Sequence, residues 1–108
     1  MTITQKEKNI ITSINTFIVE DSSKQQRVVE ILKDATQQIL IKHDGFISAR
    51  IHKSLDGTKV VNYVQWEDKK AIEKMLNDPS VIIHMNDVAN IANVDRSLYE
   101  LAFMEEKK

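Results

Sequence analysis

Cysteine is absent from this chain of 108 residues, which also has only two glycines, Gly45 and Gly57, and one proline. Without cysteine the chain cannot form a disulfide, a thiolate zinc site, an iron–sulfur cluster or a thiol nucleophile, and this composition suits a reducing, cytoplasmic environment. Two isolated glycines cannot build the glycine-rich turns that bind dinucleotides or cradle phosphates. The sequence therefore excludes thiol chemistry and the common nucleotide-binding motifs.

Long hydrophobic runs and an excess of one charge are missing as well. The longest apolar run is residues 101–104, and the opening MTITQKEKN has no hydrophobic segment, so we expect neither a membrane span nor a signal peptide. The 15 lysines and arginines nearly balance the 16 aspartates and glutamates, so we expect no nucleic-acid partner and no membrane partner. With 42% hydrophobic residues, the chain should form one domain over residues 1–108, its core at about 10–104.

The first half of the chain changes between extended and helical patterns. Residues 10–19 are rich in β-branched types, and their odd and even positions form two sets that would point to opposite faces of a sheet, which predicts a strand. A capping box within residues 22–26 opens a helix whose apolar residues recur at helical spacing to about Lys42. Gly45 is expected to end this helix in a left-handed conformation, and residues 46–55 form a second strand.

The dipeptide Asp-Gly at 56–57 predicts a two-residue hairpin turn of type I′, which needs positive φ at both positions. The third strand follows it, with Ile51 opposite Asn62 and Ile47 opposite Trp66. We expect the helices to cover the face that carries Ile47, Ala49, Ile51, Asn62, Val64 and Trp66. We expect another subunit to cover the face that carries Phe46, Ser48, Arg50, His52, Val61, Tyr63 and Gln65.

The second half predicts two short helices and a last strand. Asp68 caps the first helix, whose inward face includes Leu76, and Asp78 and Pro79 begin the second. A strand over about residues 97–104 closes an α+β ferredoxin-like βαββαβ fold, with helices on one face of an antiparallel sheet. The open face needs cover. Two such sheets packed face to face make a dimeric α+β barrel, so we expect a homodimer.

Asn62 and Trp66 are the first candidates for chemistry. They lie four residues apart on one strand, so both side chains point to the side that the register assigns to the interior. A core amide must find partners, whereas an amide in a pocket keeps its donors and acceptors for a ligand. Trp66 brings a flat apolar wall and one N–H donor, and the alternative for this residue is a simple core anchor.

Asn15 and His84 add two polar side chains to the same interior. Asn15 shares the parity of Phe17 in the first strand, and His84 lies on the apolar stripe of its helix. The alternative for His84 is a hydrogen-bonded structural histidine. Three buried polar groups in one small core suggest a cavity between the sheet and the helices.

The remaining polar residues offer no catalytic set. His43 lies in the loop that ends a helix, His52 lies on the opposite sheet face from Asn62, and no two histidines have metal-ligand spacing. The carboxylates near the ends of the elements are explained by capping. We therefore expect no metal site, no acid–base pair and no hydrolase triad.

The strings GFISARIHKSLDG at residues 45–57 and VVNYVQW at 60–66 resemble the antibiotic biosynthesis monooxygenase family. Asn15-x-Phe17 and the late Tyr99 extend the resemblance over most of the chain. Members of this family are dimeric ferredoxin-like proteins. The resemblance implies an oxygenase that oxidises polycyclic phenols or quinols to quinones with molecular oxygen and no metal or flavin.

The resemblance also implies roles for individual residues. Asn62 would hold a substrate oxygen or an oxygen derived from O₂, and Trp66 would donate its N–H and form a wall of the pocket. Where the quinone-forming members have a tyrosine early in the next helix, this chain has Ile72, and their later arginine is not evident near Asn86. His84 is the candidate to replace their proton-relay groups. The expected substrate-binding residues are Asn15, Ile72, Met75 and His84.

Two alternatives stay open at this point. Haem-degrading monooxygenases share the fold, and Asn15 and His84 fall where their asparagine and haem-ligating histidine would lie. Their catalytic tryptophan lies in the helix before that histidine, where this chain offers Met75, and Trp66 on its strand cannot replace it. A non-catalytic metabolite-binding dimer is the other alternative, because a fold does not fix a function. An oxygenase for fused rings needs a cavity of about 300 Å³ or more.

Overall fold

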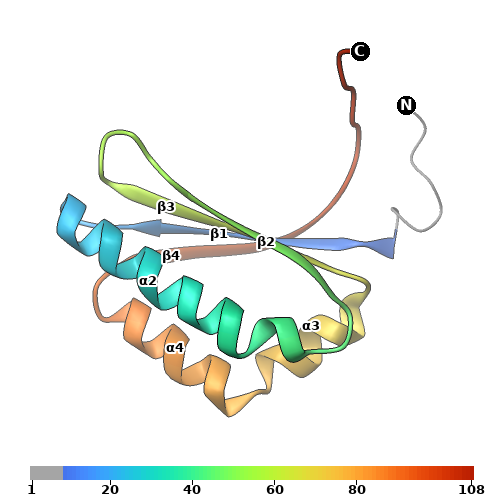
Figure 1. Cartoon of the computed structure of the whole chain (residues 1–108), viewed down its shortest axis with the longest axis horizontal. Coiled ribbons are helices and arrows are strands. Elements are labelled where there is room, and N and C mark those ends of the chain that lie inside the picture. Colours follow the sequence, from blue (N-terminus) through green and yellow to red (C-terminus); the bar gives the residue numbers. More distant parts are fainter. Residues whose placement is uncertain (1–8) are drawn as a thin grey trace.

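The computed structural model describes residues 9–108, and residues 1–8, where we expect no signal peptide, lie outside them. An antiparallel four-stranded sheet forms one layer and the helices pack on one of its faces (Figure 1). The chain order is β1 (Ile11–Ile18), α2 (Ser22–Gln38), the 3₁₀ turn η1 (Leu40–Lys42), β2 (Phe46–Lys53), β3 (Lys59–Trp66), α3 (Lys69–Leu76), α4 (Pro79–Ala89) and β4 (Asn93–Glu100). The α+β ferredoxin-like fold class is therefore confirmed, in the form βαββααβ.

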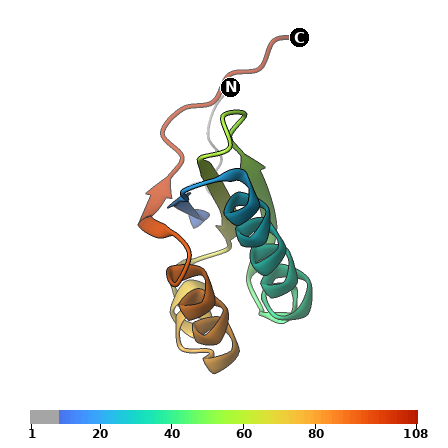
Figure 2. The ribbon, with the colours of Figure 1, turned by 90° about the vertical axis from the view of Figure 1, so that its left-hand side faces the viewer.

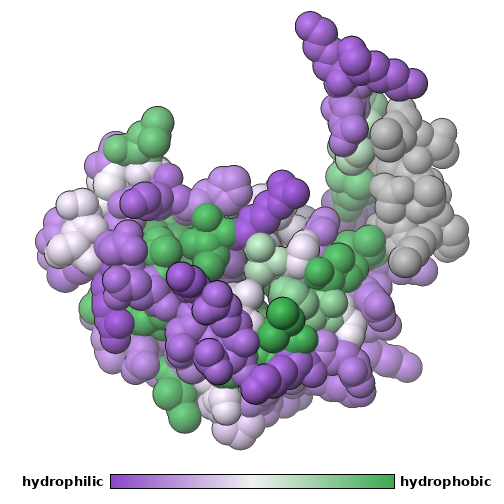
Figure 3. Space-filling model, in the orientation of Figure 1, coloured by the Kyte–Doolittle hydropathy of each residue, from purple (hydrophilic) through white to green (hydrophobic). Residues whose placement is uncertain are grey.

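The strand order is β2-β3-β1-β4, so β1 lies in the middle and β4 forms one edge. Figure 2 shows α2 next to the pair α3 and α4, all on the same side of the sheet. Within residues 9–108, no helix covers the other sheet face. In the space-filling view the molecule is hollowed above that face, between the β2–β3 hairpin and the C-terminal segment (Figure 3).

Helix α2 differs from its prediction at both ends. Its N-cap is Asp21, whose carboxylate accepts a hydrogen bond from the Lys24 N–H (3.0 Å), rather than a serine in a capping box. The Gln25 side chain is buried and donates to the Ser54 carbonyl (2.9 Å), so it ties the helix to the hairpin. The α-helix stops at Gln38, because the backbone leaves helical geometry at the next residue and tightens into η1.

Gly45 has the positive φ predicted for it, +87°, and it lies where β2 approaches α3. A Cβ at this position would lie 2.6 Å from the Cβ of Ala71. Any side chain here would therefore be strained by the backbone and would collide with α3. The glycine lets the strand and the helix that bears Ile72 and Met75 pack closely.

The hairpin turn is longer than predicted. The Ser54 N–H donates to the Lys59 carbonyl (2.9 Å), which leaves a four-residue loop, and Asp56 does not have positive φ. Hydrogen bonds from the Thr58 and Ser54 hydroxyls lower the pKa of Asp56 to about 2. Its carboxylate organises the loop, so the type I′ geometry is not needed.

The register of the hairpin is right at its centre and wrong at its open end. Ile51 lies opposite Asn62 as predicted. A β-bulge then places Phe46, not Ile47, opposite Trp66. An extra residue in one strand reverses the alternation of side chains, so Phe46 packs against the core and Ile47 is 39% exposed.

The second half confirms both predicted caps. The carboxylates of Asp68 and Asp78 accept hydrogen bonds from the first turns of α3 and α4. The prediction that Leu76 faces the core is wrong, because this residue lies at the end of α3 and is half exposed. Strand β4 spans Asn93–Glu100 and not residues 97–104, because α4 closes at Ala89 and the chain turns back almost at once.

The core lies between the sheet and the helices. One cluster surrounds Trp66, which is fully buried, and a second surrounds Val28, which is also fully buried. Within residues 9–108, no helix is long and apolar enough to cross a membrane.

Candidate active site

A row of polar side chains crosses the sheet on the face that the helices cover. Asn62 on β3 lies directly opposite Asn15 on β1, and Asn15 lies opposite Arg96 on β4. Residues directly opposite one another in an antiparallel sheet point to the same face. Asn62 is buried, Asn15 is partly buried and Arg96 lies at the exposed edge.

A cavity of about 290 Å³ lies between this row and the helices. Its walls are mostly apolar and come from all three helices and from β1, β3 and β4. The structure brings together all six residues that the sequence proposed for the site, since each of them lines the cavity: Asn15, Asn62, Trp66, Ile72, Met75 and His84. A mostly apolar pocket with few polar groups is typical of a small-molecule site, and its volume is close to the lower limit of about 300 Å³ for such sites.

Asn62 and Trp66 carry unpartnered polar atoms. The Asn62 Oδ1 and the Trp66 Nε1 are buried and make no hydrogen bond within the part of the chain that the structure describes. A buried polar atom without a partner costs roughly 1–3 kcal/mol, and such atoms are rare in folded proteins. The pair supplies one N–H donor and one amide, whose two ends donate and accept.

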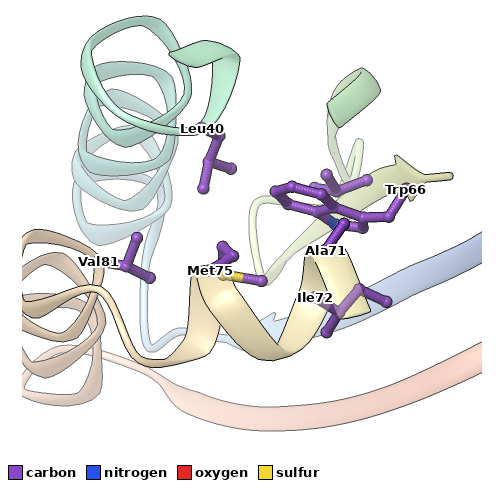
Figure 4. Packing of buried hydrophobic residues seen from close by; sticks show 7 residues of the cluster. Leu40, Trp66, Ala71, Ile72, Met75 and Val81 are labelled. Atoms are coloured by element: carbon purple, nitrogen blue, oxygen red, sulfur yellow. The ribbon is translucent and has the colours of Figure 1, made fainter. Parts of the chain in front are cut away.

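The Trp66 ring is held from several sides (Figure 4). Its indole extends from β3 to α3, where Ala71 and Ile72 pack against it. Phe46 meets it edge to face at 5.6 Å between ring centres, and His43 does so at 6.4 Å. These contacts fix the direction of the Trp66 N–H.

His43 has a structural role that the sequence analysis missed. Its Nε2 lies 2.7 Å from the carboxylate of Asp78, the N-cap of α4. This hydrogen bond, with the one from the Ser80 N–H, lowers the pKa of Asp78. A histidine in a loop gives no sequence signal for such a contact, because Asp78 is 35 residues away.

His84 lies at the wall of the cavity with both ring nitrogens engaged. Its Nδ1 lies 2.8 Å from the Ser80 carbonyl and its Nε2 lies 2.8 Å from the Asp34 carboxylate. Both partners are acceptors, so the charged imidazolium fits best, and the Asp34 hydrogen bond raises the pKa of His84. Haem ligation needs a neutral imidazole with a free nitrogen, so this arrangement does not fit a haem ligand.

The His84–Asp34 pair joins α4 to α2 and should stabilise the fold in a pH-dependent way. Because the pKa of His84 is raised in the folded chain, the stabilisation is fully present below the unfolded pKa of about 6.5 and is lost as the pH rises through the folded value. Asp34 is more than half exposed, so the effect is modest. We expect Asp34→Asn to lower Tm by roughly 2–5 °C at about pH 6 and by much less at about pH 9.

Thermal unfolding of both proteins across this pH range measures the difference. Glu30→Gln, on the same helix and in an exposed ion pair with Arg27, is the matched control and should show no such pH dependence. A gap between wild type and Asp34→Asn that stays constant with pH would contradict the assignment.

Arg96 is the charged cavity residue that the sequence analysis did not find. The predicted last strand began one residue after it, so its place beside Asn15 was not visible. Burial of its side chain lowers its pKa. The parity of β4 would have pointed to it, had the start of the strand been known. Among residues 9–108 no group of three or more acidic or histidine side chains could hold a metal ion.

The fold is one ferredoxin-like sheet with helices on one face, and the cavity between them has the character of a small-molecule site. Comparison with known families makes this specific: the model of the antibiotic biosynthesis monooxygenase family matches residues 10–81. The chain therefore belongs to the antibiotic biosynthesis monooxygenase family, as its sequence motifs predicted.

Individual relatives agree with this assignment. The tetracenomycin-F1 monooxygenase of Streptomyces glaucescens is 33% identical over 78 residues, which cover 72% of this chain and 69% of the relative. The monooxygenase of the ActVA-Orf6 gene of Streptomyces coelicolor, solved with the ligand nanaomycin D, superposes over the full length of both chains with a TM-score of 0.84 at 23% identity. SnoaB of Streptomyces nogalater, a cofactor-independent oxygenase, covers 92% of this chain and 99% of its own, with a TM-score of 0.76 at 18% identity.

Proposed function

We propose that this chain is a cofactor-independent monooxygenase that oxidises a fused-ring phenol or quinol with molecular oxygen. The observation that carries the proposal is the pair of buried, unpartnered polar atoms on Asn62 and Trp66 in the wall of an apolar cavity. Such atoms lower the stability of the chain and gain partners when a polar ligand enters. Similarity to a monooxygenase and to a cofactor-independent oxygenase supports the same reaction class.

The chemistry needs little from the protein beyond binding and electrostatics. An ionised phenol transfers one electron to O₂, and the resulting phenoxyl radical and superoxide combine at a ring carbon that bears hydrogen. Protonation gives a hydroperoxide, which loses water to leave the quinone, so one oxygen atom enters the substrate and the other leaves as water. The protein accelerates such steps by stabilising developing negative charge in a site without bulk water.

In this proposal, Asn62 and Trp66 provide that stabilisation. The indole N–H of Trp66 and the amide N–H of Asn62 would donate to the reacting oxygen, and the unpartnered Oδ1 of Asn62 would accept from a substrate hydroxyl. The two side chains lie on the same face of one strand, four residues apart. The surrounding apolar residues of α3 and α4 keep water away from the reacting oxygen and so strengthen each hydrogen bond. Ile72 and Met75 form part of this wall and add no proton-transfer group.

The proposal includes a homodimer. The sheet face away from the helices carries partly exposed apolar and aromatic residues, among them Tyr63, Tyr99 and Ile18. A sheet face of this kind is usually packed against a second layer. A second copy packed face to face would complete an α+β barrel, and sedimentation should give twice the monomer mass of 12.4 kDa. A monomeric mass at micromolar concentration would contradict it.

Oxygen uptake by the purified chain with a panel of fused-ring phenols and hydroquinones tests the reaction. We expect uptake with quinone formation and no change on addition of haem or metal ions. Glu30→Gln, at an exposed position of α2 away from the cavity, is the control and should keep full activity. Quenching of Trp66 fluorescence by a panel member without oxygen uptake would instead indicate a non-catalytic binding protein. A Soret shift abolished by His84→Ala would indicate haem chemistry.

A further inference from the structure

Arg96 places a positive charge at one end of the cavity. It lines the cavity from the edge strand β4, and within residues 9–108 no carboxylate lies within ion-pair distance of it. The neighbouring Asp95 points to the opposite sheet face, because side chains alternate along a strand. A guanidinium that lines an apolar cavity at its exposed edge and has no counter-ion within the described residues favours an anionic ligand.

The cavity therefore has two different ends. Arg96 and Asn62 lie in the same cross-strand row, separated by Asn15 on the strand between them. Two strand spacings put the backbones of Arg96 and Asn62 roughly 10 Å apart. A flat molecule of several fused rings can reach from one end to the other, with apolar side chains of α3 and α4 against its face.

We propose that Arg96 binds an anionic oxygen group of the substrate, a carboxylate or an ionised phenol, at the β4 end of the cavity. The substrate is accordingly a fused-ring aromatic anion, and the charged end decides which ring lies beside Asn62 and Trp66. This inference rests on the proposed function in one respect, since it takes the cavity as the substrate site. A guanidinium binds a carboxylate through two parallel hydrogen bonds, which fixes orientation as well as affinity.

Binding of oxidised probes tests the inference without any turnover. The probes are 9,10-anthraquinone-2-carboxylate and its neutral carboxamide, and the signal is quenching of Trp66, the single tryptophan. We expect the wild-type chain to bind the carboxylate about tenfold or more tightly than the carboxamide. Arg96→Gln should lose this preference and keep its affinity for the carboxamide. Arg96→Lys should keep part of it, because the charge remains without the planar fork.

A second probe distinguishes the two sources of the anion. The affinity for 2-hydroxyanthraquinone should rise as its phenol ionises in the wild type and not in Arg96→Gln, if phenolate is accepted as well as carboxylate. Arg27→Gln, a charge-matched change at an exposed position of α2 away from the cavity, should leave all affinities unchanged. Equal wild-type affinity for carboxylate and carboxamide, equal loss of both in Arg96→Gln, or no binding of either probe would overturn the inference.

These results are independent of the oxidation reaction. A charge preference that depends on Arg96 in a chain without oxygen uptake would uphold this inference and refute the proposed reaction. Oxygen uptake without a charge preference would do the reverse.

Discussion

Replacing Asn62 with leucine should remove most of the turnover while making the folded chain more stable. Loss of one donor to a developing oxyanion typically costs about 10² to 10³ in kcat. The buried Oδ1 of Asn62 has no partner within the described residues, so an apolar side chain of similar size removes its desolvation cost. We expect the free energy of unfolding to rise by about 1 kcal/mol.

Steady-state oxygen uptake and chemical denaturation, measured on the same preparations, check both parts. Asn86→Leu is the control, because Asn86 is an exposed amide on α4 and its replacement should change neither quantity much. Unchanged kcat in Asn62→Leu would remove Asn62 from the mechanism. A loss of stability of several kcal/mol would show that the amide is a satisfied core group.

Replacing Trp66 with phenylalanine should lower kcat by roughly 10- to 100-fold with a smaller effect on KM, because the aromatic wall stays and the N–H donor is lost. Trp66 is fully buried and packs against Phe46 and His43, so the smaller ring also leaves a void. We expect the free energy of unfolding to fall by about 1–3 kcal/mol.

A packing defect alone must be separated from the loss of the donor. Val28→Ala is suited to this, because Val28 is fully buried in the other core cluster and its truncation should lower stability by about 1–3 kcal/mol. We expect Val28→Ala to keep kcat within a few-fold of wild type at a temperature where both variants are folded. Equal losses of kcat in Val28→Ala and Trp66→Phe would return Trp66 to the role of a core anchor.

Both predictions follow from one property of the site. The Asn62 Oδ1 and the Trp66 Nε1 lack partners within residues 9–108, which lowers the stability of the chain, and we propose that a ligand supplies those partners. Groups of this kind are exceptions in folded proteins, and they concentrate at functional sites.

The sequence by itself determined the fold class, the face that carries Asn62 and Trp66, and the starts of α3 and α4. These features depend on local rules: the alternation of side chains along a strand, the capping by Asp68 and Asp78, and positive φ at a glycine. The central pairing of Ile51 with Asn62 followed from the same alternation, although the turn that connects the strands was longer than predicted. The family motifs around Asn62 and Trp66 were visible at this level too.

The tertiary structure decided the rest, because it depends on contacts between residues far apart in the chain. The bulge that turns Phe46 toward Trp66, the pairing of His43 with Asp78 and that of His84 with Asp34 have no local signature. The position of Arg96 depended on where β4 begins, which is set by how α4 closes and how the chain returns to the sheet. The unpartnered state of the Asn62 and Trp66 polar atoms is likewise a property of everything packed around them, and only a folded chain has it.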